Sequence, residues 1–565
     1  MKKNFFHILI IGFFILTHNA FSDEIINITF NVKLECDTPK GEVVCVGIGE
    51  GGKAYALNKV NDKEWSKKIS IDDWGVGGTM LYRYCRNHVA FGADESFDNK
   101  NKMGWRKLKI TNNSLSVNDV VRKWRWWPVD GVIPRIDDSS HSKVSPSYLP
   151  LPNFICGVQL PDWWVNEFSP YVEPTLDKIV KKAKANWIQY NPIPEITQFY
   201  PTPIIVREGE NGTPEKELIK IITQAHKRGL KVFLNPFVWP FFVKDPSPKY
   251  HSDDWWRAYE AQWRPIISYY AKIAQQYRVE MINFSMWPSS VDSNDETRTV
   301  DELALQLLDS IRSIYKYSIC ISYDPYGPDL NVYGKSDNLG FGIWDFWPYQ
   351  LSDSKNPQVA EMIKKLAEGL DGHLGVLSSR WGKQIILSTI SSSSYDGTVI
   401  GKPYWESQLY YYKDDIKVPI DVQEQADAYE AILQTVSGRS WIKGAFSFNY
   451  NYWDSIDKAP SIRTKPAELV VAKWFKWMNP FRVTLSISIS GQGTTRPGPA
   501  SYVKSLGKKY TVTAIANPGY TFSGWSGNIP EAQKKTNPLI VLMEYDTSLI
   551  ARFKKIETRV QEGSD

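Results

Sequence analysis

Eight short apolar runs recur through the middle of the chain, and segments with helical periodicity separate them. The runs are Phe154–Leu160, Ala185–Asn191, Lys231–Val238, Glu280–Trp287, Ser318–Asp324, Leu339–Phe346, Gln384–Ser391 and Ile442–Asn451. The clearest helical patterns are Pro174–Ala185, Thr213–Arg228, Trp255–Tyr277, Thr299–Tyr315 and Val422–Thr435. Because parallel strands need crossover connections, eight such strand-and-helix units predict a closed (β/α)8 TIM barrel.

The segments on either side of this region have different patterns. Short alternating strands broken by Gly and Asp predict a β-sandwich at 23–128, and a Ser-, Pro- and Asp-rich stretch at 129–152 is typical of a linker. The barrel then spans 153–479, a small all-β module spans 480–556, and 557–565 is a tail. The sequence therefore predicts a multidomain chain: a β-sandwich, a TIM barrel and a small all-β module.

The first 22 residues have the pattern of a signal peptide. Lys2 and Lys3 precede the apolar run Ile8–Leu16, and Ala20-Phe21-Ser22 offers small residues for cleavage. The run is shorter than the ~20 residues that span a bilayer, and no later segment supplies one. We expect a secreted, periplasmic or cell-surface protein without a transmembrane segment; the sequence leaves periplasm versus extracellular space open.

Charge and aromatic content narrow the class of partner. The net charge of +5 over 565 residues gives no strong field to gather nucleic acid, so we predict no nucleic-acid partner. Aromatic residues make up 14% of the chain, with 23 Trp and 30 Tyr. Flat amphipathic rings can stack on the C–H faces of sugars, although core packing accounts for many of them.

Cysteine and histidine spacing predicts no metal site. The chain has five cysteines, and a disulfide between two of Cys36, Cys45 and Cys85 fits an oxidising compartment, with the pairing left open. Cys156 and Cys320 fall in barrel strands and are expected to be buried. The seven His residues are scattered and no phosphate loop is present, so we predict no cofactor.

Several phrases of the barrel, in order, resemble the large clan of retaining glycoside hydrolases, and within it a bacterial β-mannanase-like family. They are Ala185-Asn186-Trp187-Ile188, Gln198, Ala225–Val232, Trp453-Asp454-Ser455 and Lys465-Pro466-Ala467. The resemblance covers about Phe154–Trp477 and implies a carbohydrate polymer or oligosaccharide as the partner. It also implies two catalytic glutamates, at the ends of strands four and seven.

This sequence departs from the family pattern at both catalytic positions. Aligning Val279–Trp287 with strand four puts Trp287 in the place of the acid/base glutamate, and aligning Lys383–Ile390 with strand seven puts Thr389 in the place of the nucleophile. Tryptophan cannot transfer the proton, and threonine without a base is a poor nucleophile. The retaining mechanism of the family is therefore not expected, and the chain is a pseudoenzyme candidate.

The flanking segments carry resemblances of their own. The phrases Cys36-Asp37-Thr38-Pro39, Tyr82–Asn87 and Trp124–Pro128 resemble starch-binding-like sandwich modules. The phrase from Thr513 to Gly527, which contains Asn517-Pro518-Gly519-Tyr520, resembles a small repeat domain of bacterial surface and secreted proteins, which implies association with the cell surface.

Three functions remain open at this point. A binding protein would hold a sugar through aromatic and amide side chains at the strand ends, for which the candidates are Gln198, Asn235, Trp239, Trp287, Tyr323, Trp344, Trp347, Asn449 and Trp453. A glycosidase would need a relocated acid pair, for which Asp324 and Asp345 at the ends of adjacent strands are the candidates. A non-catalytic surface scaffold or adhesin would use the barrel as a rigid body.

Overall fold

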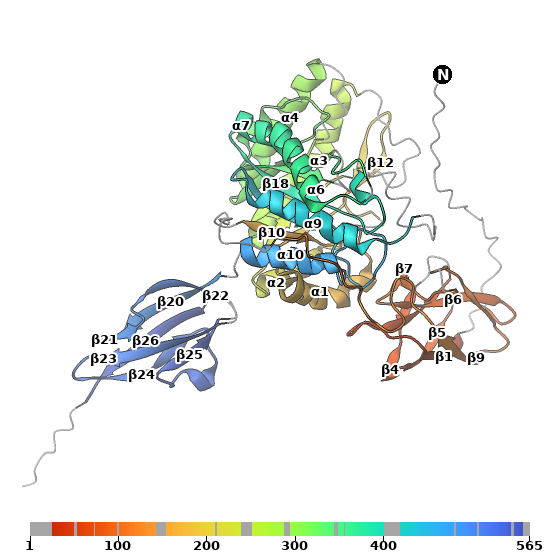
Figure 1. Ribbon diagram of the computed structural model, residues 1–565, viewed down its shortest axis with the longest axis horizontal. Coiled ribbons are helices and arrows are strands. Elements are labelled where there is room, and N and C mark those ends of the chain that lie inside the picture. Colours follow the sequence, from red (N-terminus) through yellow and green to blue (C-terminus); the bar gives the residue numbers. More distant parts are fainter. Residues whose placement is uncertain are drawn as a thin grey trace, which may run out of the picture. The chain divides into compact units, whose positions relative to one another are not determined.

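The structure is a computed structural model of the chain (Figure 1). It describes residues 25–49, 53–72, 74–98, 101–142, 154–209, 212–238, 251–286, 294–343, 349–354, 356–400, 418–478, 482–505, 508–543 and 547–557. The predicted signal peptide and most of the predicted tail lie outside these ranges. The chain divides between Val132 and Ile133 into two compact units.

The first unit consists of two β-sheets, as expected for a sandwich. One sheet has the order β4-β5-β1-β9, and the other has the order β3-β2-β6-β7 with β8 paired to β6. Alternate residues of β1 are buried, as the period of two requires. The strands are β1 (Ile26–Leu34), β2 (Val44–Ile48), β3 (Ala54–Ala56), β4 (Asn58–Asn61), β5 (Glu64–Ile71), β6 (Thr79–Arg86), β7 (Val89–Asp94), β8 (Arg106–Lys109) and β9 (Ser114–Val121).

The second unit contains the predicted closed parallel barrel. Its strands pair in chain order and the last pairs with the first: β10 (Ile155–Gln159), β11 (Trp187–Tyr190), β14 (Lys231–Leu234), β15 (Met281–Phe284), β16 (Ser318–Ser322), β17 (Asn338–Ile343), β18 (Gln384–Ile390) and β19 (Ile442–Ser447). The barrel prediction is confirmed, and each strand overlaps a predicted apolar run. A hairpin of β12 (Glu195–Gln198) and β13 (Ile204–Val206) follows β11.

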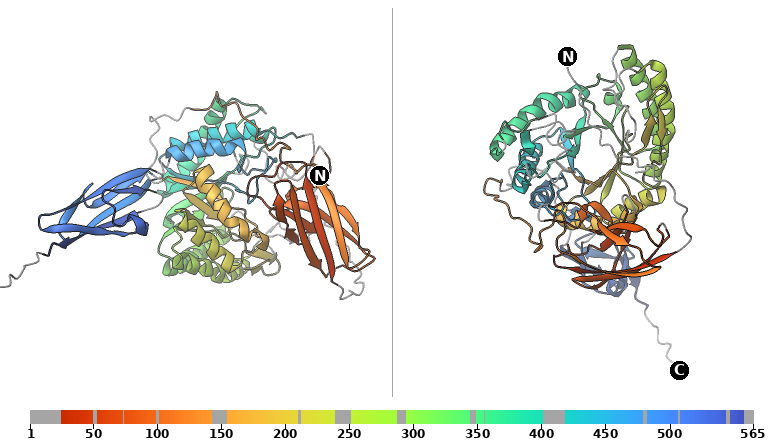
Figure 2. Two further views of the ribbon diagram at one scale, coloured as in Figure 1. Left: turned by 90° about the horizontal axis from the view of Figure 1, so that it is seen from below. Right: turned by 90° about the vertical axis from the view of Figure 1, so that its right-hand side faces the viewer.

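Helices form a layer outside the barrel strands (Figure 2). The longer ones are α2 (Glu215–Lys227), α3 (Asp253–Gln276), α4 (Asn294–Ile314), α6 (Val359–Leu370), α9 (Val422–Ser437) and α10 (Pro466–Met478). Short helical segments complete the layer: η1 (Asn166–Tyr171), α1 (Val172–Lys178), η2 (Ile179–Ala183), α5 (Val332–Lys335), η4 (Asp371–Gly375), α7 (Val376–Trp381) and η5 (Thr398–Ile400). Side chains cap the N-termini of two helices. Ser252 accepts a hydrogen bond from Trp255 N at 3.2 Å at the start of α3, and Asp421 accepts one from Glu424 N at 2.8 Å at the start of α9. No helix among the described residues is long and apolar enough to cross a membrane.

Part of the predicted linker lies along helix α9. Asp137 N donates to Gln423 Oε1 at 2.7 Å, and Ser142 N donates to Glu430 Oε1 at 2.9 Å. His141, between them, is within 2.6 Å of Asp427 Oδ1. The described end of this segment is therefore hydrogen-bonded to the barrel's helical layer.

The C-terminal module is all β, as predicted. Its sheets have the orders β22-β20-β26-β24 and β21-β23-β25, and Trp525, 3% exposed, lies in their shared core. The elements are β20 (Arg482–Ser490), β21 (Gly493–Arg496), β22 (Ala500–Ser505), β23 (Lys509–Ala516), β24 (Tyr520–Gly527), η6 (Glu531–Gln533), β25 (Leu539–Leu542) and β26 (Thr547–Lys555).

Candidate functional site

A polar layer lies inside the barrel near the C-terminal ends of its strands. Deeper in the barrel the inward side chains form an apolar cluster of Ile155, Trp187, Phe233, Met281, Cys320, Ile386 and Phe446. Because side chains alternate along a strand, the residues at every second position beyond this cluster also point into the barrel. They carry amides and hydroxyls: Gln159, Gln189, Asn191, Asn235, Asn283, Ser322 and Thr389. This is the end of a TIM barrel at which functional groups are found.

One half of the polar layer is a connected group around Gln159. Gln189 Nε2 donates to Asn191 Oδ1 at 3.0 Å and lies 3.4 Å from Gln159 Oε1. Thr389 Oγ1 lies 3.5 Å from the same Gln159 oxygen. A bulge in β18 pairs Leu387 with Phe341 and Thr389 with the next residue, which turns Thr389 inward. The group thus joins the first, second and seventh strands of the barrel.

Asp162 is the acid attached to this group. Its Oδ1 accepts from Asn191 Nδ2 at 2.9 Å and from Gln159 Nε2. Burial raises the pKa of Asp162 to about 7, against the two hydrogen bonds, which lower it. The carboxyl therefore titrates near neutral pH and fixes which way both amides point.

The other half of the layer centres on Asn283. Its Nδ2 donates to Asn235 Oδ1 at 2.6 Å and to Ser322 Oγ at 2.8 Å. Asn283 is 2% exposed, and its Oδ1 accepts no hydrogen bond among the described residues. Gln189 Oε1 and Asn449 Oδ1 are likewise buried without a donor in that part of the chain. These oxygens are suited to accept hydrogen bonds from hydroxyl groups.

Aromatic rings lie on the loops that follow β10 and β19. Trp163 comes directly after Asp162 and is 36% exposed, whereas Trp453 is 7% exposed. The two ring centroids are 6.2 Å apart, and Phe168 lies 4.8 Å from Trp163. Trp163 therefore presents an indole to solvent beside the acid that orders the polar layer.

The predicted site residues have different surroundings. Asn235 belongs to the polar layer, and Asn449 adopts a left-handed backbone with φ of 58°. Gln198 donates to Thr202 O at 2.9 Å within the β12–β13 turn. Tyr323 packs 5.4 Å from Tyr333, in a cluster with Phe341 and His373, so its ring lies on the outer side of the strand.

Asp324 accepts a hydrogen bond from Tyr326 N at 3.0 Å, as a residue that caps its own turn does. The other candidates, Trp239, Trp287, Trp344, Asp345 and Trp347, lie outside the described residues. Their roles, and that of the Asp324–Asp345 pair, stay predictions.

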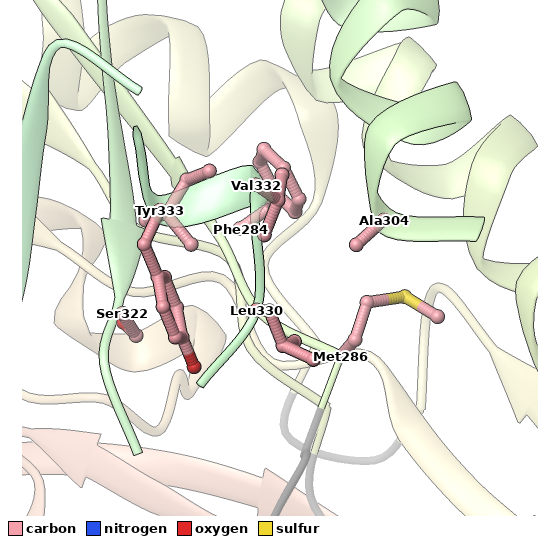
Figure 3. Close-up of a pocket in the computed structure, with 8 residues that line it drawn as sticks. Phe284, Met286, Ala304, Ser322, Leu330, Val332 and Tyr333 are labelled. Carbon is pink, nitrogen blue, oxygen red and sulfur yellow. The ribbon is translucent and has the colours of Figure 1, made fainter. Parts of the chain in front are cut away.

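A small apolar pocket lies on the other side of β15, between this strand and the helices (Figure 3). Phe284 and Met286 of the β15 segment line it together with Ala304 of α4 and Val332 of α5. Its volume of about 10 Å³ is room for one water molecule at most. The pocket cannot hold a sugar, but its lining shows that Phe284 and Met286 point away from the barrel axis.

One group of three acids has the spacing of a metal site. The carboxylates of Asp396, Asp421 and Glu424 lie within 4.8 Å of one another. Glu424 accepts from Gly397 N at 2.7 Å and from Val399 N at 3.0 Å, and Asp421 caps helix α9. These bonds attach the loop after β18 to the helix, which gives the acids a structural role.

Residues 168–461 match the model of Glycoside Hydrolase Family 113, and residues 483–557 match the Divergent InlB B-repeat domain. No curated protein matches the chain.

Solved structures that are similar to the chain include three mannanases. A β-1,4-mannanase of Family 113 is 18% identical, with 57% of this chain and 99% of that chain covered and a TM-score of 0.45. The Family 113 β-mannanase from Alicyclobacillus acidocaldarius is 17% identical, with 58% and 98% covered and a TM-score of 0.44. The endo-β-1,4-mannanase from Thermotoga petrophila is 9% identical, with 69% and 88% covered and a TM-score of 0.36.

The family match covers more than half of the chain and includes seven of the eight barrel strands together with Asn191, Asn283 and Thr389 of the polar layer. This chain belongs to Glycoside Hydrolase Family 113 and carries a C-terminal InlB-like B-repeat domain.

Proposed function

We propose that the barrel binds a neutral poly- or oligosaccharide at its polar layer and does not cleave it by the family's two-glutamate mechanism. The observation that carries this proposal is the chemistry of the layer in a chain of a carbohydrate-active family. Amide groups donate and accept hydrogen bonds at once, as sugar hydroxyls do. Among the residues that the structure describes, the buried oxygens of Gln189 and Asn283 accept no hydrogen bond, so they could accept from sugar hydroxyls.

The proposed loss of the family's two glutamates is supported by the described parts of two strands. Retaining hydrolysis needs two carboxyl groups about 5–5.5 Å apart. The described segments Met281–Met286 and Gln384–Ser394 contain neither Asp nor Glu. The contact of Thr389 with Gln159 supports the assignment of Thr389 to the nucleophile's place, and Trp287 at the acid/base position is the second part of this proposal.

A glycosidase with a relocated acid pair is the main alternative. It would use Asp324 and Asp345, but Asp324 Oδ1 already accepts the backbone N–H of Tyr326. A non-catalytic scaffold or adhesin is the third function. It has no use for buried acceptors inside the barrel, whereas a sugar-binding protein does.

Export and surface attachment form a separate part of the proposal. The pattern of residues 1–22 supports secretion through a signal peptide, and the B-repeat domain at 483–557 supports a cell-surface location. The N-terminal sandwich would add a second sugar-binding surface. Trp65 of β5 is 6% exposed and belongs to the core of the sandwich, so it is not part of that surface.

Incubation of the chain from residue 23 onward with β-mannan, starch and cell-wall glycans tests the proposal. We expect at least one insoluble glycan to pull the protein down while no reducing ends are released. Release of reducing ends that disappears in both Asp324→Asn and Asp345→Asn would overturn it in favour of the relocated pair. If no glycan of the panel retains the protein and none releases reducing ends, the result would favour the scaffold.

A further inference from the structure

Two of the five cysteines face each other across one pair of strands. Cys45 of β2 lies directly opposite Cys85 of β6, and both are 0% exposed. In the same register Asn87 N donates to Val43 O at 2.9 Å and Gly49 N donates to Leu81 O at 2.8 Å. In an antiparallel ladder hydrogen-bonded pairs alternate with non-hydrogen-bonded ones. Cys45 and Cys85, which come two residues after the hydrogen-bonded pair of Val43 and Asn87, are therefore also a hydrogen-bonded pair, with Cα atoms about 5.5 Å apart. Disulfides span Cα separations of about 4.4–6.8 Å.

The two thiols also interact chemically. Burial would raise the pKa of Cys45, but hydrogen bonds with Cys85 and His88 outweigh it and lower that pKa to about 5. The hydrogen bond with Cys45 and burial raise the pKa of Cys85. The two thiols therefore lie within hydrogen-bonding reach of each other in the closed sheet.

The other three cysteines have different surroundings. Cys36 Sγ is 4.0 Å from Val121 O, Cys156 Sγ is 3.8 Å from Phe475 O, and Cys320 lies inside the barrel beside Gly340. Burial raises the pKa of each thiol, that of Cys36 to about 11. Such thiols are unreactive. The odd cysteine count is therefore explained by one pair and three buried thiols.

We propose that Cys45 and Cys85 form a disulfide that joins β2 to β6 in the mature protein. The bond forms by exchange with an oxidant of the disulfide class, such as oxidised glutathione. The thiolate of one of the two cysteines attacks one sulfur of the oxidant and expels a thiolate, which leaves a mixed disulfide. The thiol of the other cysteine then attacks the cysteine sulfur of that mixed disulfide and expels the second half of the oxidant, which takes up the proton. Two cysteines are oxidised and one oxidant disulfide is reduced to two thiols.

The exchange must take place while the strand pair is still open, because neither thiol is exposed once the sheet has formed. The bond closes the chain between residues 45 and 85 and so restricts the unfolded sandwich. This inference does not depend on whether the barrel binds a sugar.

Refolding of the reduced chain from residue 23 onward in a glutathione redox buffer, followed by alkylation in denaturant and peptide mass spectrometry, tests the proposal. We expect alkylated Cys36, Cys156 and Cys320 and one linked peptide pair that contains Cys45 and Cys85. Alkylation of all five cysteines, a lasting glutathione adduct on Cys45, or a link that includes Cys36 would overturn it. Cys36→Ser should keep the link, whereas Cys45→Ser should leave Cys85 alkylated.

Discussion

Replacement of Asp162 by asparagine should remove a pH dependence from the stability of the barrel. Asp162 Oδ1 accepts both amide N–H groups, from Gln159 and Asn191, so an asparagine of the same shape keeps both hydrogen bonds. The substitution therefore removes only the titration of the carboxyl group. Burial raises the pKa of Asp162 from 3.8 to about 7 in the folded protein.

The direction and size of the effect follow from this difference. A carboxyl whose pKa is higher in the folded state stabilises the fold below the unfolded pKa, and this contribution is lost as pH rises through the folded pKa. Each pH unit between the two values is worth about 1.4 kcal/mol, so the wild-type barrel loses about 3 kcal/mol relative to Asp162→Asn between pH 5 and pH 8. At about 2–4 °C per kcal/mol for a large domain, the melting temperatures should diverge by roughly 5–10 °C.

Differential scanning calorimetry of both proteins at pH 5, 6, 7 and 8 measures the effect, because other titrating groups cancel in the difference. Asp353→Asn is the matched control. Its carboxylate is 84% exposed, pairs with Lys365 at 2.7 Å and accepts from Gln350 Nε2 at 2.8 Å, so its difference from the wild type should stay within about 0.5 kcal/mol at every pH. A wild-type minus Asp162→Asn difference that does not change with pH would refute the reasoning.

Three further changes test the packing and charge of the fold. Gly157→Ala should destabilise the barrel by about 1–3 kcal/mol in denaturant unfolding, because its Cβ would lie 2.0 Å from Phe446 Cδ1, whereas Gly372→Ala, with no atom within 4 Å, should not. Trp525→Ala should cost the C-terminal module about 3–5 kcal/mol by calorimetry, since it empties a core position and removes the bond from Nε1 to a backbone carbonyl at 2.9 Å. Burial would raise the pKa of Asp454, but the cations Arg463 and Lys178 hold that pKa well below its usual range. The contribution of Asp454 to the stability of the fold is therefore present above pH 4 and lost as the pH falls. Asp454→Asn should cost about 3–5 kcal/mol of the free energy of unfolding at pH 7, and less in acid.

The barrel could be predicted from the sequence because its strands are fully buried and read as continuous apolar runs. Gln384–Ser391 and β18 (Gln384–Ile390), for example, differ by one residue. The expected helices omit α6, although Val359, Met362, Leu366 and Leu370 recur at helical spacing and are buried. The β12–β13 hairpin has only short runs and gave no comparable pattern.

The site was harder to predict because strand ends alone do not tell which side chains point inward. Gln189 and Asn283 were missed, although each lies two residues beyond an inward apolar side chain, Trp187 and Met281. Tyr323 was selected as a strand-end aromatic, but Ser322 before it faces Asn283, which turns Tyr323 toward the helices. Every second residue after an inward apolar side chain also points inward, and this rule distinguishes Gln189 and Asn283 from Tyr323.

Asp162 and Trp163 follow β10, whereas the family resemblance predicts catalytic acids at the ends of strands four and seven. Nothing in their spacing marks them, since the hydrogen bonds to Asp162 come from Gln159 at the end of β10 and from Asn191 after β11. Contacts of this kind depend on closure of the barrel, which brings the strand ends together in space.

Binding isotherms on an insoluble glycan retained by the wild type test the central claim most directly, with Asn283→Leu as the variant. Asn338→Leu is the control, because Asn338 is an equally buried amide at the opposite end of the barrel, bonded to Ser318 Oγ at 3.0 Å. Loss of hydrogen bonds worth about 1.5 kcal/mol should weaken binding about tenfold in Asn283→Leu and leave it unchanged in Asn338→Leu, with no reducing ends released by either. Equal affinity of Asn283→Leu and wild type would contradict a sugar site at the polar layer.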